Sequence, residues 1–154
     1  MPLHFTSGDL LDSTCMALVS PVNCVGVAGA GLAKQFKDRW PRQVAEYAAF
    51  CRAGKMAPGV LHEALLPDGR SIVSVPTKRH WRDESRLSDV YSGINTLAEY
   101  CRDAGIPSMA IPALGCGLGG LPKHLVLNAI KLKMHDLQTE VWLYGFEGSA
   151  SPRR

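Results

Sequence analysis

The sequence lacks any apolar run of the roughly 20 residues that a transmembrane helix needs. Its first residues, MPLHFTSGDLL, lack the charged start and the long apolar stretch of a signal peptide. It also contains no internal repeat, linker or low-complexity tract. These absences argue against a membrane-spanning, secreted or repeat protein, and they predict a cytoplasmic protein with no membrane partner.

Cysteine spacing shows no pairing pattern. The five cysteines are odd in number and contain no CxxC pair, which argues against a disulfide framework and a zinc knuckle. We expect Cys15, Cys51 and Cys101 to be small buried hydrophobes. For Cys24 and Cys116 a lowered thiol pKa near a helix start stays open. The histidines form no ligand set either, so no metal site is predicted.

Neither positive nor negative charge is in large excess. The formal net charge is only +3 over 154 residues, of which 46% are hydrophobic and 20% charged. This balance permits an anionic ligand but does not by itself indicate nucleic acid. The length predicts a single domain with a real core. We assign residues 1–147 to this domain and the polar residues 148–154 to a tail.

Hydrophobic periodicity and turn residues predict alternating strands and helices. Strands are expected at 3–6, 16–22, 108–114 and 140–146, and helices at 32–39, 42–54, 87–104 and 122–137. Asp68 and Gly69, between two strand-like runs, predict a hairpin over 60–77. The alternation predicts an α/β sheet with helices on both faces, and the hairpin makes the sheet mixed. In such sheets ligands bind outside the carboxyl ends of the strands.

Two glycine-rich loops each leave a predicted strand and enter a predicted helix. They read PVNCVGVAGAGLAKQF over 21–36 and IPALGCGLGGLPKHLV over 111–126. Glycine lets the backbone approach a ligand closely, and a helix N-terminus offers unpaired N–H groups to an anion. Two such loops favour a diphosphate ligand, a nucleotide sugar or a dinucleotide, over glycines that only form tight turns. GCGLGG fits GxGxxG, but a single helix and strand follow it, which disfavours a nicotinamide-type Rossmann site.

Four segments, in this order and spacing, resemble the macrodomain family. They are GDLLD at 8–12, VNCVGVAGAGLAKQFK at 22–37, PTKRHWR at 76–82 and IPALGCGLGGL at 111–121, and the similarity covers residues 3–146. The most similar branch is the DNA ADP-ribosyl glycohydrolase antitoxins, the DarG family, with its eukaryotic terminal-ADP-ribose hydrolase relatives. The resemblance implies a three-layer α/β/α macrodomain fold with a mixed, mostly parallel central sheet, an ADP-ribose ligand and no cofactor.

The resemblance also implies roles for single residues. Asp9 matches the acid that accepts a hydrogen bond from the adenine amino group, and a helix N-cap is the alternative role for this residue. Asn23 matches the asparagine that holds the distal ribose hydroxyls. The other residues implied to bind ADP-ribose come from the same four segments: Leu10, Gly29, Ala30, Gly31, Leu32, Thr77, Gly115, Cys116, Gly117, Leu118 and Gly119.

Lys78 matches the lysine that the DarG-like branch uses for catalysis. It could orient water, protonate the leaving group or attack as a Schiff-base nucleophile, and the alternative is an exposed lysine with a solvated charge. The chain departs from the family pattern in both loops. Ala28 and Ala30 stand where members often have Met and Lys. Gly119 stands where the eukaryotic relatives carry a catalytic aspartate, so Lys78 is expected to act without an acidic partner.

A basic and aromatic cluster follows this lysine: Arg79, His80, Trp81, Arg82 and Arg86. Cations around an aromatic ring suit a groove for a single strand of nucleic acid. The alternative is a surface loop in which Trp81 packs on the core.

The leading hypothesis is an enzyme that removes ADP-ribose from a nucleobase, thymidine in single-stranded DNA, and so reverses a DarT-like toxin. The enzymatic alternative removes ADP-ribose from protein carboxylates or deacetylates O-acetyl-ADP-ribose. The non-enzymatic alternative is a module that only binds ADP-ribose. The antitoxins have a further toxin-binding region, so we expect the chain to be a fragment, a stand-alone hydrolase or a phage-type protein, and to be a monomer.

Overall fold

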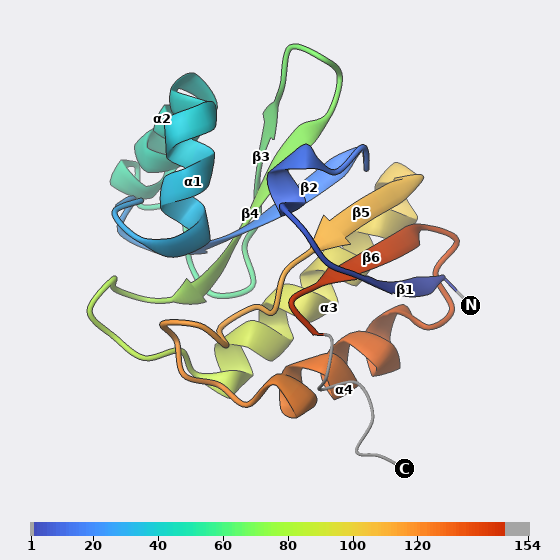
Figure 1. The fold of residues 1–154 in the computed structure, drawn as a ribbon. Helices are drawn as coiled ribbons and strands as arrows, with labels where there is room; N and C mark the ends of the chain where they lie inside the picture. Colours follow the sequence, from blue (N-terminus) through green and yellow to red (C-terminus); the bar gives the residue numbers. More distant parts are fainter. Residues whose placement is uncertain (1, 147–154) are drawn as a thin grey trace.

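The computed structural model describes residues 2–146 and contains the predicted strands and helices (Figure 1). The predicted domain end at residue 147 and the polar tail at 148–154 lie outside the described residues, so the domain boundary stays a prediction. No helix within residues 2–146 combines the length and the apolarity needed to cross a membrane.

A mixed sheet forms the middle of the molecule. Within residues 2–146 it has six strands in the order β1-β6-β5-β2-β4-β3. The strands are β1 (Leu3–Thr6), β2 (Ala17–Asn23), β3 (His62–Leu65), β4 (Ser71–Lys78), β5 (Ser108–Ile111) and β6 (Glu140–Tyr144). Neighbouring strands pair in parallel except β3, which runs antiparallel to β4 through the predicted hairpin. The prediction of a mixed, mostly parallel sheet is confirmed.

Helices cover both faces of this sheet (Figure 1). They are α1 (Gly31–Arg39), α2 (Pro41–Arg52), α3 (Leu87–Ala104) and α4 (Lys123–Met134), with a one-turn 3-10 helix, η1 (Leu10–Asp12), between β1 and β2. α3 and α4 pack on one face around the larger cluster of buried side chains, and α1 and α2 pack on the other face. The predicted three-layer α/β/α architecture is confirmed.

Helix α3 illustrates why these elements form. Val90, Ile94, Leu97 and Cys101 recur at helical spacing and are at most 2% exposed, because they pack on the sheet. Gly105 ends the helix in the left-handed conformation with a φ of 63°, and its N–H donates to the carbonyl of Cys101. The predicted helix over 87–104 and its stop at Gly105 are therefore confirmed.

Strand β4 continues to Lys78, one residue beyond the predicted hairpin. It does so because it pairs in parallel with the end of β2, where Asn23 lies opposite Lys78. The described pairs between β3 and β4 end at Ser74, so Pro76 is paired on one side only, with β2. A strand position of this kind tolerates proline, which has no N–H to donate. Lys78 is thereby fixed on the sheet and not on a loop.

The five parallel strands all end at one edge of the sheet. Along this edge the order is β1, β6, β5, β2 and β4. Neighbouring strands are about 4.8 Å apart, so the ends of β1 and β4 are separated by roughly 19 Å. The segments that follow these strands are 7–9, 145–146, 112–122, 24–30 and 79–86, in the same order. Both glycine loops and Lys78 therefore lie at one edge, as the sequence predicts.

Candidate ligand-binding cleft

A cleft of about 1180 Å³ lies along this edge and is lined by residues at the ends of all five parallel strands. It collects every residue predicted to bind ADP-ribose or to catalyse its release: Asp9, Leu10, Asn23, Gly29, Ala30, Gly31, Leu32, Thr77, Lys78, Gly115, Cys116, Gly117, Leu118 and Gly119. The structure thus brings the predicted residues together, while their contacts with a ligand stay predictions.

Sequence reasoning missed further residues that line the cleft. They are Gly8, Pro21, Val22, Val27, Ala33, Gln35, Pro112, Ala113, Lys123, Tyr144 and Gly145. The rule that ligands bind beyond strand ends points to Tyr144 and Gly145, because β6 ends there. Lys123 begins α4 directly after the second glycine loop, a position that suits a cation facing an anionic ligand.

Asp9 lies at the β1 end of the cleft and is exposed. Its Oδ1 accepts a hydrogen bond from the N–H of Leu11 at 3.0 Å, which makes Asp9 the N-cap of η1. The capping alternative is therefore confirmed, and it leaves the residue in the cleft. The cap and the predicted adenine contact are compatible, because a carboxylate has two oxygens that accept hydrogen bonds.

The amide of Asn23 shapes the first glycine loop. Its Oδ1 accepts hydrogen bonds from the N–H groups of Val25, Gly26 and Val27 and from the hydroxyl of Tyr47, and its Nδ2 donates to the carbonyl of Val27 at 2.8 Å. Burial raises the pKa of the Tyr47 phenol, so it stays a donor. Because Oδ1 and one hydrogen of Nδ2 already bind the loop, only the second hydrogen of Nδ2 is left for the predicted contact with the ribose hydroxyls.

Gly119 has no room for a side chain. A Cβ at this position would lie 2.2 Å from Ser85 Oγ and 2.5 Å from the carbonyl oxygen of Gly115. The N–H of Ser85 also donates to the carbonyl of Gly119 at 3.0 Å, so the second glycine loop rests on Ser85. Ser85 Oγ is buried and has no hydrogen-bond partner among the described residues. An acid at position 119 does not fit this loop, and Lys78 has no carboxylate partner from it.

The thiols of Cys24 and Cys116 are not activated. Burial raises the pKa of both thiols above its ordinary value, and for Cys116 the nearby Lys123 opposes this shift. The lowered pKa that the sequence left open is wrong, because α1 begins at Gly31 and α4 at Lys123. A helix end acts on a charge only within about one turn.

The other three cysteines are buried, as predicted: Cys15, Cys51 and Cys101. Within residues 2–146 no three His, Cys, Asp or Glu side chains form a group that could hold a metal ion.

Arg79 is an exposed residue that forms an ion pair with a buried carboxylate. Its Nε and Nη2 donate to the two carboxylate oxygens of Asp89 at 3.0 and 3.1 Å, and Asp89 is buried. These hydrogen bonds raise the pKa of Arg79, so its charge is kept. Because Asp89 lies in the first turn of α3, the pair ties the end of β4 to this helix. We therefore assign an anchoring role to Arg79, and its predicted contact with nucleic acid stays a prediction, because its side chain is 48% exposed.

The basic loop, residues 79–86, presents an aromatic ring with cations beside it. Trp81 is 47% exposed and lines the cleft, so the alternative in which it packs on the core is wrong. Cζ of Arg82 lies 4.7 Å over the Trp81 ring. The His80 ring lies 5.3 Å from that of Trp81, and its Nδ1 accepts a hydrogen bond from the N–H of Arg82. Arg86 is exposed at the start of α3.

Fold and cleft place the chain among three-layer α/β domains that open at the carboxyl ends of a mixed sheet. Residues 19–130 match the family described as Macro domain, and the chain belongs to this family. The predicted resemblance is thereby confirmed at the level of the family.

Two curated relatives indicate the branch of the macrodomain family to which the chain is most similar. The chain is 42% identical to the DNA ADP-ribosyl glycohydrolase of Mycobacterium tuberculosis over 122 residues, which cover 77% of this chain and 35% of that protein. It is 38% identical to the DNA ADP-ribosyl glycohydrolase of Thermus aquaticus over 146 residues, 92% of this chain and 41% of that protein. The resemblance to the DarG branch is confirmed, and the chain spans 35–41% of the length of these curated relatives.

Solved structures agree with the relatives. The macrodomain of Thermus aquaticus DarG matches with a TM-score of 0.87 at 38% identity, over 92% of this chain and 97% of that chain. Thermosipho africanus DarTG in complex with ADP-ribose matches with a TM-score of 0.84 at 31% identity, over 92% of this chain and 41% of that chain.

Proposed function

We propose that this macrodomain is an ADP-ribosyl glycohydrolase that removes ADP-ribose from a nucleobase, thymidine in single-stranded DNA, and so reverses a DarT-like DNA ADP-ribosyltransferase. The observation that carries the proposal is the cleft, which runs along five strand ends from Asp9 to Lys78 with both glycine loops between them. The relatives named DNA ADP-ribosyl glycohydrolase support the reaction. The DarTG structure with ADP-ribose supports the ligand.

An extended ligand with two different ends fits the order of groups along the cleft. Adenine lies at the β1 end, where the carboxylate of Asp9 can accept a hydrogen bond from the amino group. The diphosphate lies over the two glycine loops, where the start of α1 and the ammonium of Lys123 offer positive charge. The distal ribose then lies at the β4 end, beside Asn23 and Lys78, which are paired across β2 and β4.

Hydrolysis at this end requires water to add to the anomeric carbon while the bond from that carbon to the base nitrogen breaks. The electron pair of the broken bond stays on the base, which takes up a proton, and the carbon passes through an oxocarbenium-like state. Lys78 is the ionisable side chain that the cleft offers at the β4 end, since Gly119 has no room for an acid. Lys78 orients the water, protonates the base or attacks the carbon as an amine.

The basic loop supports a nucleic-acid substrate over a protein substrate. The half-exposed ring of Trp81 lies in the cleft that also contains Lys78, and a ring of this kind stacks on any base. Arg82 and Arg86 are exposed and offer charge to the phosphates that flank the modified nucleotide.

Two substrates test the proposal. The protein is incubated with single-stranded DNA carrying ADP-ribosylated thymidine and, separately, with a glutamate-ADP-ribosylated protein, and free ADP-ribose is measured. We expect release from the DNA. Release from the protein alone would favour hydrolysis at carboxylates. Release from neither substrate, with ADP-ribose still bound, would favour a module that only binds the ligand.

Lys78→Ala separates binding from chemistry. We expect the variant to keep its ADP-ribose affinity within a few-fold, because Asp9 and the two loops hold the ligand. Hydrolysis should fall by a factor of at least ~100, as when a positioned acid or base is removed. Lys37→Ala is the matched control, since Lys37 is an exposed lysine of α1 that does not line the cleft. Normal turnover by Lys78→Ala would show that the catalytic assignment is wrong.

A DarT-like partner is proposed from the name of one relative, the DNA ADP-ribosyl transferase-DNA ADP-ribosyl glycohydrolase fusion protein of Thermosipho africanus. The monomeric state and the cytoplasmic location rest on the sequence alone. Light scattering during gel filtration tests the first, and fractionation of the cell of origin tests the second.

A further inference from the structure

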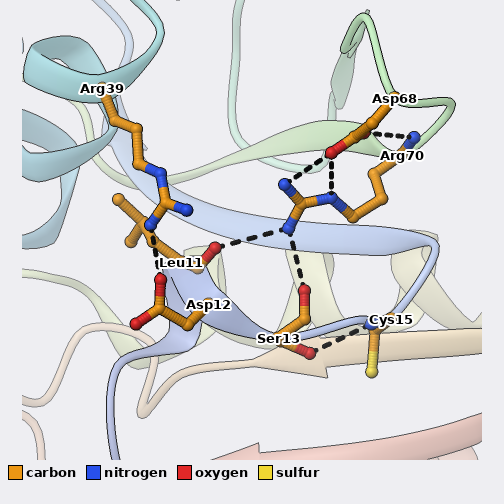
Figure 2. Close-up of polar contacts among 7 residues, drawn as sticks. All are labelled: Leu11, Asp12, Ser13, Cys15, Arg39, Asp68 and Arg70. Atoms are coloured by element: carbon orange, nitrogen blue, oxygen red, sulfur yellow. Dashed lines mark hydrogen bonds and ion pairs between the residues drawn. The ribbon is translucent and has the colours of Figure 1, made fainter.

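The turn that carries Asp9 and Leu10 is held in place by an arginine from the β3–β4 hairpin (Figure 2). Nη1 of Arg70 donates hydrogen bonds to the carbonyl of Leu11 at 3.3 Å and to the carbonyl of Ser13 at 2.8 Å. The turn itself, η1, spans three residues, and a 3-10 turn of this length has little stability of its own. Its orientation therefore depends on contacts from other parts of the chain.

Arg70 is itself fixed in one orientation. Its Nε donates to Asp68 Oδ2 at 2.9 Å, its backbone N–H donates to Asp68 Oδ1 at 3.1 Å, and its guanidinium lies over the ring of Trp40. The side chain is only 16% exposed. Hydrogen bonds from Arg70 hold the pKa of Asp68 below its ordinary value, so the carboxylate stays charged. A planar guanidinium can bind the carboxylate and both carbonyls at once, and a lysine ammonium cannot reproduce this fork.

Other contacts to the turn do not set its orientation as firmly. Arg39 Nη1 lies 2.7 Å from Asp12 Oδ1, but both side chains are well exposed, so this ion pair is weak. Leu10 and Leu11 are buried and hold the turn against the core, although apolar contacts have no directional preference. Arg70 is the polar contact with both a fixed orientation and a buried setting.

We propose that Arg70 is a positioning residue for recognition of the adenine amino group, an inference that rests on the proposed function. Arg70 fixes Leu11 through its carbonyl, and the N–H of Leu11 fixes Asp9 Oδ1 at 3.0 Å. The orientation of Arg70 is thereby passed to the carboxylate that faces the cleft. A hydrogen bond weakens steeply when it is misaligned. The orientation of the turn therefore sets the preference in affinity for adenine over a base without the amino group.

Base discrimination is the quantity that tests this role. Dissociation constants are measured by titration calorimetry for ADP-ribose and for IDP-ribose, in which oxygen replaces the adenine amino group. We expect the wild-type protein to prefer ADP-ribose by roughly tenfold or more, as a hydrogen bond to a charged group implies. In Arg70→Lys the preference should fall below about threefold while the affinity for IDP-ribose changes little.

Arg102→Lys is the matched control. Arg102 also joins distant segments through one carbonyl and one carboxylate, those of Lys133 and Asp136, but it does so on α3 away from the cleft. It should keep the full preference for ADP-ribose. Asp68→Asn is the milder variant, since it keeps the hairpin turn and removes the charge that orients Arg70, and it should lose part of the preference.

The possible results distinguish failure of this inference from failure of the proposed function. No binding of ADP-ribose by the wild-type protein overturns the proposed function and this inference with it. Wild-type binding without a preference over IDP-ribose overturns the inference alone. So does Arg70→Lys with the full preference, or with an equal loss for both ligands, which would mark a merely structural arginine. If Arg70→Lys does not fold, an unchanged preference in Asp68→Asn overturns the inference and a reduced one supports it.

Discussion

Gly119 and Gly117 lie two residues apart in the second glycine loop, yet they differ in the room around them. A Cβ on Gly119 would meet Ser85 Oγ at 2.2 Å and a backbone oxygen at 2.5 Å, whereas a Cβ on Gly117 would meet nothing within 4 Å. We expect Gly119→Ala to lower the free energy of unfolding by about 1–3 kcal/mol, as overpacking does, and to weaken ADP-ribose binding. Gly117→Ala should leave the free energy of unfolding unchanged. Urea unfolding and calorimetry check the pair, and equal effects would contradict the assigned packing.

The substitution Lys78→Arg tests whether the positive charge of Lys78 is sufficient for hydrolysis. The guanidinium keeps a positive charge at the end of β4, but it can neither attack carbon nor give up a proton near neutral pH. We therefore expect hydrolysis of ADP-ribosylated DNA to fall nearly as far as in Lys78→Ala, with ADP-ribose still bound. Single-turnover release of ADP-ribose measures the loss. Near-normal turnover in Lys78→Arg would reduce Lys78 to an electrostatic contact.

Strand β3 contains a partly buried imidazole, that of His62, with one buried ring nitrogen. Nδ1 of His62 has no hydrogen-bond partner among the described residues, and the ring packs 4.9 Å from that of Phe50. Burial lowers the pKa of His62 from its ordinary value of about 6.5. Between the two pKa values the unfolded chain binds more protons than the folded one. The contribution of His62 to stability is therefore fully present above about pH 6.5 and is lost as the pH falls through the folded pKa.

His62→Phe should remove this pH dependence. A second aromatic ring fits beside Phe50 and cannot be protonated, so the loss of unfolding free energy between about pH 7.5 and pH 5.5 should be smaller than in the wild type. Urea unfolding at the two pH values measures the difference. A loss of the same size in both proteins would show that another group causes it.

If the basic loop binds DNA phosphates, the affinity for DNA should depend on salt concentration through its arginines. Arg82→Glu with Arg86→Glu should weaken binding of ADP-ribosylated single-stranded DNA, and each lost phosphate contact should reduce the slope of log affinity against log salt by about 0.7. Arg52→Glu, an exposed arginine at the end of α2 that does not line the cleft, is the control. Binding and slope that match this control would remove the support for a DNA substrate.

Local signals made much of this fold predictable, and contacts between distant segments account for what was missed. Gly105 and the apolar spacing of α3 suffice to predict that helix, because both act within a few residues. η1 receives hydrogen bonds from Arg70, far along the chain, and the space at Gly119 is limited by Ser85 in another loop. Asn23 was placed in the cleft from a motif, but its amide oxygen and one amide hydrogen bind its own loop, which no spacing in the sequence reveals.

The cleft joins the two outer layers of the molecule. The first glycine loop leads into α1 on one face of the sheet, and the second leads into α4 on the other face (Figure 1). Its lining residues run from Gly8 to Gly145, nearly the whole described chain. A ligand that spans the cleft therefore requires both layers to be packed on the sheet, and the unfolded chain offers it no comparable site.

This dependence predicts a large thermal shift. A ligand that binds only the folded state at 100 times its dissociation constant stabilises that state by about 2.7 kcal/mol. For a chain of this size each kcal/mol raises the melting temperature by about 2–4 °C, so ADP-ribose should raise it by about 5–10 °C. Gly117→Glu places a carboxylate against the diphosphate where a side chain otherwise has space, so it should fold normally and show no shift. Scanning calorimetry with and without ADP-ribose measures both proteins. A wild-type protein that does not respond at millimolar ADP-ribose would contradict the assignment of the cleft to this ligand, and a Gly117→Glu variant that responds fully would place the diphosphate away from the second loop.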